Sequence, residues 1–260
     1  MMKKTALITG ASSGIGLETA RQLASEGVSL VLVARRKERL EALAGELKES
    51  SGTDARVIPL DLSRAGAGKE LFEITEQESI EIDYLVNNAG FGGYGAFTER
   101  EWDNDRDMIQ VNITALTEIT RYYLPGMVAR KRGAILNVAS TAGLIPGPYQ
   151  SVYYATKSYV ISFSQAISHE LKGTGVTVTA LLPSATATEF AATGNLEETR
   201  LFSGKVDSAA RVATEGIRAM KKGKLIKINK ASEGFALRYL VPFVPRTMAL
   251  KVSANLMENG

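Results

Sequence analysis

The sequence predicts an α/β protein with a parallel sheet covered by helices on both faces. Three observations support this. Short β-branched or aliphatic runs alternate with longer amphipathic stretches, a glycine-rich turn follows the first of those runs, and 260 residues are enough for one large domain without disulfides. Because two parallel strands joined by a helix form the repeating unit of such sheets, seven runs predict a seven-stranded, doubly wound sheet.

Each strand is predicted from a short apolar run. The seven predicted strands are Ala6–Thr9, Leu30–Val33, Arg56–Leu60, Tyr84–Asn87, Ala134–Val138, Val176–Leu182 and Leu225–Ile228. Apolar residues at helical spacing predict a helix after each of the first two strands, over residues 15–24 and 40–47, and further helices over 110–131, 153–171 and 208–221. The stretch Thr98–Glu101 fits a capping box, so we expect another helix to begin there.

Two segments lack a clear pattern. Residues 184–206 are poor in periodicity and lie where a lid over a site is expected, and residues 229–260 form a basic and aromatic extension of the single domain predicted for 1–260. Nine basic and two acidic residues fall between positions 218 and 260. This extension packs against the body or a second subunit, or it touches anionic lipid, and we favour packing.

Composition excludes several classes of protein. The net charge of +3 is too mixed to predict nucleic-acid binding, and no run of about 18 apolar residues predicts a membrane span. Without cysteine there is no disulfide, thiolate metal site or cysteine nucleophile, and we expect no metal. The first apolar run is too short for a signal peptide, so we expect a cytoplasmic protein.

The turn after the first strand predicts a dinucleotide site. At a strand-to-helix junction, exposed helix N–H groups and the positive end of the helix dipole bind a pyrophosphate, and glycine allows its close approach. The expected contacts are Gly10, Ser12, Ser13, Gly14, Ile15 and Gly16. An ordinary tight turn is the alternative interpretation.

The end of the second strand indicates which dinucleotide binds. An acidic residue about twenty positions beyond the glycines would bind the ribose 2′-hydroxyl, whereas arginine suits a 2′-phosphate. Arg35 and Arg36 stand there, and their paired donors favour NADP(H). A solvated start of the next helix is the alternative.

Tyr153 and Lys157 are four residues apart on a predicted helix, so their side chains share one face. A nearby ammonium lowers the pKa of a phenol from about 10, which makes Tyr153 a candidate proton donor. Taken alone, a tyrosine and a lysine at this spacing are more often structural, and it is their context that favours catalysis. Asn88, Ser140 and the glycine turn follow other strands, and all would meet this pair at the carboxyl edge of the sheet.

This ordered set resembles the short-chain dehydrogenase/reductase family, which has a Rossmann-like fold. The resemblance rests on TGASSGIG (9–16), Asp61-Leu62-Ser63, NNAG (87–90), Asn112, Ser140 and YYATK (153–157), over about residues 5–190. It implies that Tyr153 exchanges the proton on the substrate oxygen, that Ser140 binds that oxygen, and that Lys157 holds the nicotinamide ribose.

The resemblance implies further roles. Asn112 would keep a helix distortion and a water linked to Lys157, and the hydride would leave C4 of the nicotinamide. The remaining cofactor contacts would be Asp61, Leu62, Asn88, Ala89, Gly90, Pro183 and Thr188. From the residues alone, the favoured interpretations are a buried amide bonded to backbone for Asn112 and a strand-end cap for Ser140. The family usually has Pro-Gly where this chain has Pro183-Ser184, which restricts the backbone and adds a hydroxyl near the substrate.

The expected walls of the substrate pocket are mostly apolar or small: Phe91, Gly92, Thr141, Ala142, Leu144, Gln150, Ser184, Ala185 and Phe190. They suit a hydrophobic aliphatic or aromatic ketone or a keto ester, interconverted with its secondary alcohol. The family resemblance also suggests a homodimer or homotetramer.

Two other functions compete with a ketone reductase. Gly10–Gly14 also matches G-x-S-x-G, so a serine hydrolase using Ser12 is conceivable, although His169 is the chain's single histidine and falls within a predicted helix. An NADP(H)-binding sensor or scaffold without turnover is the other alternative.

Overall fold

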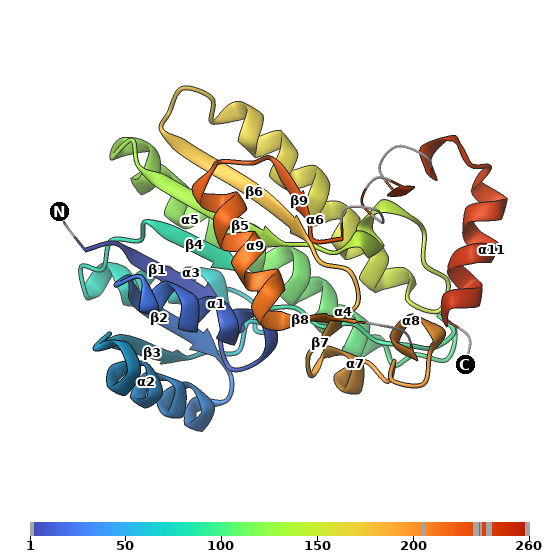
Figure 1. Ribbon diagram of the computed structural model, residues 1–260, viewed down its shortest axis with the longest axis horizontal. Coiled ribbons are helices and arrows are strands. Elements are labelled where there is room, and N and C mark those ends of the chain that lie inside the picture. The colour runs from blue at the N-terminus through green and yellow to red at the C-terminus, as the bar shows by residue number, and fades with distance from the viewer. Residues whose placement is uncertain (1–2, 204–205, 231–233, 235, 238–240, 258–260) are drawn as a thin grey trace.

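The computed structural model describes residues 3–203, 206–230, 234, 236–237 and 241–257, and it contains the predicted seven-stranded parallel sheet (Figure 1). The strands are β1 (Thr5–Thr9), β2 (Ser29–Ala34), β3 (Ala55–Pro59), β4 (Tyr84–Asn87), β5 (Gly133–Val138), β6 (Val176–Leu182) and β9 (Ile226–Ile228). Their order is β3-β2-β1-β4-β5-β6-β9, and every neighbouring pair is parallel. Both ends of each predicted strand are confirmed to within one residue.

Helices cover both faces of the sheet (Figure 1). One layer contains α1 (Gly14–Ser25), α2 (Lys37–Ser51) and α9 (Ala209–Lys221), and the other contains α3 (Ala67–Gln77), α5 (Leu116–Ala129) and α6 (Ser151–Glu170). Because successive strand side chains point to opposite faces, Ala6 and Ile8 pack in the first layer and Leu7 in the second. This arrangement confirms the doubly wound, Rossmann-like fold.

The strand order places a crevice at one edge of the sheet. β1 lies between β2 and β4, so the chain runs outward in one direction through β2 and β3 and in the other through β4 and β5. The connections after β1 and β4 therefore leave in opposite directions at the carboxyl edge. Ligand sites in open α/β sheets lie at this reversal of strand order.

The helix expected to begin at the capping box begins later. Glu101 is the N-cap of α4 (Trp102–Ile109), in an extended conformation and without a side-chain cap, so the predicted start at Thr98–Glu101 is wrong. The guanidinium of Arg100 instead donates to the buried carboxylate of Asp105 at 2.9 Å and to the carbonyl of Tyr94. These contacts hold the preceding residues outside the helix.

The expected lid contains short elements. The described part of 184–206 contains β7 (Thr186–Ala187), α7 (Phe190–Thr193) and α8 (Arg200–Ser203). β7 pairs with β8 (Asp207–Ser208), which directly follows the segment. Residues 204–205 of this segment lie outside the described residues.

The C-terminal extension is described in part. Of residues 229–260, the positions 231–233, 235, 238–240 and 258–260 lie outside the described residues. A 3-10 turn (Val241–Phe243) leads to α11 (Arg246–Met257), which contacts α8 and buries Ser253 and Met257. Its described part thus contacts the body through α8, while Phe243, Met248 and Val252 stay exposed, so the preference for packing over lipid contact stays a prediction. Among the described helices, none is both long and apolar enough to cross a membrane.

Candidate functional site

A cavity of about 650 Å³ lies at the carboxyl edge of the sheet and gathers most of the predicted site residues. Tyr153, Lys157 and Ser140 line it. So do the predicted cofactor contacts Gly10, Ser12, Ser13, Gly14, Ile15, Arg35, Arg36, Asp61, Leu62, Asn88, Ala89, Gly90, Pro183 and Thr188, and the predicted substrate walls Phe91, Thr141, Ala142, Gln150, Ser184, Ala185 and Phe190. Segments from six strand ends therefore form one hollow, as the ordered motifs predict.

The glycine turn is joined to the end of β4 by hydrogen bonds. The side-chain amide of Asn88 donates to the carbonyls of Thr9 and Gly10 at 2.9 and 3.2 Å, and the Thr9 hydroxyl accepts from the backbone N–H groups of Asn88 and Ala89. Gly10 has a φ of +66°, which favours glycine. Two strand ends are thus tied together beneath the cavity.

Gly16 lies behind the turn and does not line the cavity. A Cβ on this residue would stand 2.3 Å from the carbonyl oxygen of Gly10 and 2.5 Å from the amide nitrogen of Asn88. The predicted direct contact of Gly16 with the cofactor is therefore replaced by a packing role, in which α1 approaches the turn closely.

This close approach predicts a large effect of a small substitution. Gly16→Ala should lower the free energy of unfolding by about 2–3 kcal/mol, because its methyl group would meet backbone that cannot move aside. Gly45→Ala is the control, since no atom lies within 4 Å of its Cβ and it sits inside α2; it should gain about 0.5–1 kcal/mol. Urea unfolding measures both, and equal effects would contradict the close approach.

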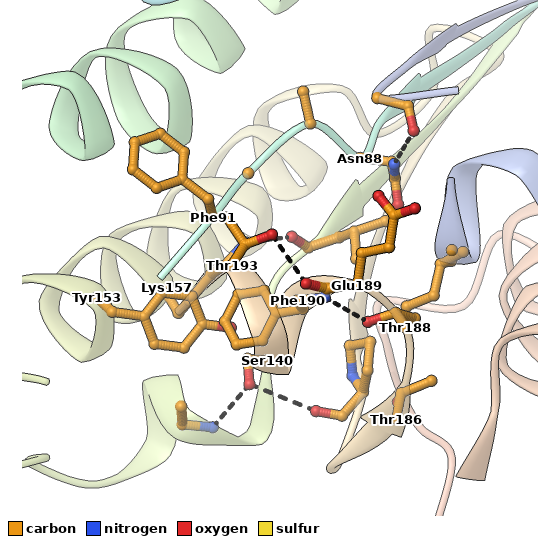
Figure 2. Close-up of a pocket in the computed structure, with 18 of the residues that line it drawn as sticks. Asn88, Phe91, Ser140, Tyr153, Lys157, Thr186, Thr188, Glu189, Phe190 and Thr193 are labelled. Carbon is orange, nitrogen blue, oxygen red and sulfur yellow. Dashed lines mark hydrogen bonds between the residues drawn. The ribbon is translucent and has the colours of Figure 1, made fainter. Parts of the chain in front are cut away.

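Tyr153 and Lys157 extend from one face of α6 toward Ser140 (Figure 2). Both side chains are buried; the Lys157 ammonium donates to the Val138 carbonyl at 2.9 Å and lies 5.8 Å from the centre of the Tyr153 ring. The ring of Phe190 covers Tyr153, with a centroid distance of 5.1 Å. A proton-bearing group and a cation are therefore held together and shielded from water.

Burial governs the pKa values of this pair. It raises the pKa of the Tyr153 phenol above its ordinary value, an effect that a hydrogen bond with Ser140 opposes. It lowers the pKa of the Lys157 ammonium to about 8. The expected lowering of the phenol's pKa by the ammonium is therefore wrong for this structure: the pKa is raised, chiefly because the phenol has lost its solvent.

Asn112 does not line the cavity, but its side chain hydrogen-bonds residues next to those that do. It lies in a π-helical turn (Gln110–Ala115) between α4 and α5, which confirms the helix distortion that the family resemblance implies. Its side-chain amide accepts from the N–H of Phe91 at 3.2 Å and donates to the carbonyl of Phe91 and the hydroxyl of Thr156, each at 3.0 Å. The loop after β4 is thereby fixed to α6, one residue before Lys157.

Ser140 both caps a 3-10 turn and lines the cavity beside Tyr153. Its hydroxyl accepts from the N–H of Ala142 at 3.1 Å, capping the 3-10 turn Thr141–Leu144, and donates to the carbonyl of Pro183 at 3.4 Å. The same hydroxyl lowers the pKa of the Tyr153 phenol and so opposes the effect of burial. The two interpretations of Ser140 are compatible.

Two predicted substrate walls are misplaced. Leu144 packs on the core between α6 and β6 because the 3-10 turn directs it inward, and Ile145 lines the cavity instead. Gly92 lines a neighbouring hollow, where a Cβ would meet the ring of Phe190 at 2.7 Å. The apolar walls that sequence reasoning missed include Ile145, Tyr154, Leu196, Leu201, Phe202, Leu237 and Leu256.

The turn at Ser184 is held by a neighbouring strand. The N–H of Ser184 donates to the side chain of Asn229 at 2.9 Å, and the amide of Asn229 donates to the carboxylate of Asp207. The Ser184 hydroxyl is buried and has no hydrogen-bond partner among the described residues. Ser184 is not among the described residues with a positive φ, so the backbone here does not require the glycine that the family usually has.

The hydrolase hypothesis is wrong. Ser12 follows β1 at the carboxyl edge of the sheet, and its hydroxyl accepts from Arg36. His169 is exposed near the end of α6, just before β6 begins at the opposite edge. A histidine on the other side of the sheet cannot take the proton of Ser12.

Comparisons with known proteins agree with this geometry. Residues 4–199 match the family model described as short chain dehydrogenase. The human very-long-chain 3-oxoacyl-CoA reductase is 32% identical over 98% of the chain and 80% of the relative, and the duck protein of that name is 36% identical over 71% of the chain. The chain spans only 60% of the length of the duck protein.

Solved structures are similar over almost the whole chain. A short-chain dehydrogenase from Sphingobium yanoikuyae in complex with NADPH has a TM-score of 0.81 and 33% identity, covering 94% of this chain and 97% of that one. The bulky-bulky ketone specific alcohol dehydrogenase from Comamonas testosteroni has a TM-score of 0.78 and 30% identity, covering 97% and 99%. The family match, the sheet and the gathered Tyr153, Lys157 and Ser140 lead to one conclusion: this chain belongs to the short-chain dehydrogenase/reductase family, whose NAD(P)-dependent oxidoreductases act on carbonyl and alcohol substrates.

Proposed function

We propose that this protein reduces hydrophobic ketones, including bulky ketones and keto esters, with NADPH. The observation that carries this proposal is the continuity of the cavity. It runs from Arg35 and Arg36 at the end of β2, past the glycine turn, to Tyr153 and Lys157, and it continues between apolar walls. A dinucleotide and an apolar substrate thus have adjoining places in one hollow.

The chain's own groups fit NADP(H). Ser13 is the N-cap of α1 but makes no side-chain cap, so N–H groups of the first helical turn remain available to a pyrophosphate at the cavity. Arg35 and Arg36 line the cavity where a ribose 2′-phosphate would lie. When bound, NADPH supplies the hydride that reduces the carbonyl carbon.

The protein residues would supply the proton and the orientation. The Tyr153 phenol is protonated at neutral pH, as any phenol with a pKa of about 10 or above is, so it carries a proton that it can donate to the ketone oxygen. The Ser140 hydroxyl, which donates to the Pro183 carbonyl at 3.4 Å in this structure, would turn to donate its hydrogen bond to this oxygen instead. The Lys157 ammonium would stabilise the phenolate left after proton transfer, and Asn112 keeps α6 in register with the loop after β4.

The apolar walls support a large, water-poor substrate. Phe190, Phe202 and Leu196 stand on the lid side, and Leu237 and Leu256 come from the C-terminal extension. Such walls bind an apolar group by removing it from water. The similar Comamonas testosteroni enzyme is specific for bulky-bulky ketones, which favours the same substrate class here.

The direct test is NADPH oxidation with a panel of aryl alkyl ketones, long-chain ketones and keto esters, with small polar ketones as the comparison. We expect turnover of the hydrophobic compounds at higher kcat/KM than of the polar ones. No turnover with any compound would exclude the proposal.

Cofactor preference has its own prediction. Replacing both Arg35 and Arg36 by Ala should lower kcat/KM for NADPH about 10–100-fold, the effect of losing charge-assisted hydrogen bonds, and leave that for NADH nearly unchanged. Arg21→Ala is the matched control, because Arg21 is an exposed, ion-paired arginine on α1 that does not line the cavity. Initial rates with both cofactors measure this; an equal loss with NADPH and NADH would contradict the assignment.

A further inference from the structure

Glu189 lines the cavity, and its carboxylate reaches the arginines at the start of α2. One of its oxygens lies 2.8 Å from the Arg36 guanidinium, and the other pairs with Arg39. Arg36 also donates to the Ser12 hydroxyl at 3.1 Å. These ion pairs hold the pKa of Glu189 below its ordinary value. Glu189 therefore occupies donors beside the glycine turn while belonging to the segment between β7 and α7.

The neighbours of Glu189 connect this contact with the rest of the site (Figure 2). Thr188 lies against the glycine turn, where a Cβ on Gly14 would stand 3.0 Å from its methyl group. Phe190 covers the ring of Tyr153. The three consecutive residues 188–190 thus contact the glycine turn, the arginines and the ring of Tyr153. If Glu189 leaves the arginines, the adjacent Phe190, which packs on Tyr153, is expected to move with it.

Carboxylate and phosphate compete for the same donors. Each accepts paired hydrogen bonds from a guanidinium, and two anions at one guanidinium repel each other. Arg35 lines the same cavity, and within the described ranges its side chain has no hydrogen bond or ion pair. The phosphate would meet one guanidinium that is available and a neighbouring one that is already paired with Glu189.

We propose that Glu189 is a specificity-determining residue that competes with the 2′-phosphate of NADP(H) for Arg36. This inference rests on the proposed use of NADPH. Binding of NADP(H) exchanges the carboxylate for the phosphate and releases residues 188–190 from α2. NAD(H), which has no 2′-phosphate, leaves the ion pairs in place. Glu189 thereby makes NADP(H) bind less tightly than the arginines alone would allow.

The test is Glu189→Gln in the full chain, which removes the charge and keeps the size of the side chain. Isothermal titration calorimetry would measure NADPH, NADH, 2′,5′-ADP and 5′-AMP. We expect NADPH and 2′,5′-ADP to bind about threefold to tenfold more tightly, the effect of releasing two exposed ion pairs, and the other two ligands to stay within about twofold. Unchanged or weaker binding of the 2′-phosphates overturns the inference. Equal tightening of all four ligands also overturns it, because that would be a general charge effect.

Glu46→Gln is the matched control. Glu46 pairs with Arg21 at 2.7 Å, and the two side chains are 45% and 41% exposed, against 46% and 41% for Glu189 and Arg36. It should leave all four affinities unchanged. The wild-type affinities separate the two proposals. If the wild type binds NADH as tightly as NADPH, the proposed cofactor preference is wrong. If the wild type prefers NADPH but Glu189→Gln binds it no more tightly, only the proposed competition between Glu189 and the 2′-phosphate is wrong.

Discussion

Tyr153→Phe is expected to lower kcat/KM for ketone reduction by about 10²–10⁴-fold, the usual contribution of a positioned proton donor. Among the cavity-lining residues that the structure describes, the Tyr153 phenol carries a proton and lies beside Lys157 and Ser140. Phenylalanine keeps the ring that packs on Phe190, so the cavity should keep its shape. The dissociation constant of NADPH, followed by fluorescence titration, should stay within about twofold, because the ring is retained.

Tyr159→Phe is the control for this loss. It is the same substitution on the same helix, but Tyr159 is partly exposed, its hydroxyl pairs with that of Thr117, and it does not line the cavity. It should retain nearly full activity. If Tyr153→Phe keeps wild-type turnover, Tyr153 is not the proton donor; if the wild type binds NADPH and turns over no ketone, a sensor without catalysis becomes the better explanation.

The sheet and its crevice follow from local sequence patterns. Ala6, Leu7 and Ile8 form a continuous apolar run, so their sequence does not indicate which side chain faces which helix layer. A parallel sheet is covered on both faces, however, and in this structure helices cover both faces. The sequence alone predicts that four features lie close together, because each follows a strand or lies on the next helix: the glycine turn, Ser140, Tyr153 and Lys157. Parallel strands then place them at one edge.

Contacts between distant segments could not be predicted in this way. Arg100 lies outside α4 and pairs with the buried Asp105. This ion pair between side chains is favoured over the capping box that the sequence of residues 98–101 indicates. Leu144 turns inward with a 3-10 turn that has no periodic signal. The contact of Glu189 with Arg36 joins residues 153 positions apart, and nothing in either local sequence indicates it. The walls from Leu237 and Leu256 likewise depend on how the C-terminal extension packs.

Lys157→Met should make the protein more stable and much less active. Burial lowers the pKa of Lys157 from its ordinary 10.5 to about 8, so below pH 8 the folded state holds a charged, desolvated ammonium. At 1.36 kcal/mol per pKa unit, burying this ammonium destabilises the folded wild type by roughly 3 kcal/mol, and Lys157→Met removes that cost. The substitution also removes the hydrogen bond to the Val138 carbonyl, which destabilises the variant by about 1–2 kcal/mol. The net gain in unfolding free energy at pH 7 should be about 1–2 kcal/mol, while kcat/KM falls at least about 100-fold without the cation.

The pH dependence identifies the cause of this gain. Between pH 8 and 10.5 the folded wild type releases the Lys157 proton that the unfolded chain still holds, so this group's contribution makes the wild type more stable as pH rises. The advantage of Lys157→Met, measured by urea unfolding, should therefore shrink across that window. Lys69→Met, at an exposed lysine on α3, should show neither the gain nor the pH trend. If Lys157→Met is less stable than the wild type at pH 7, the buried ammonium contributes more through its contacts than it loses by desolvation, and the site is not a place where stability was given up for catalysis.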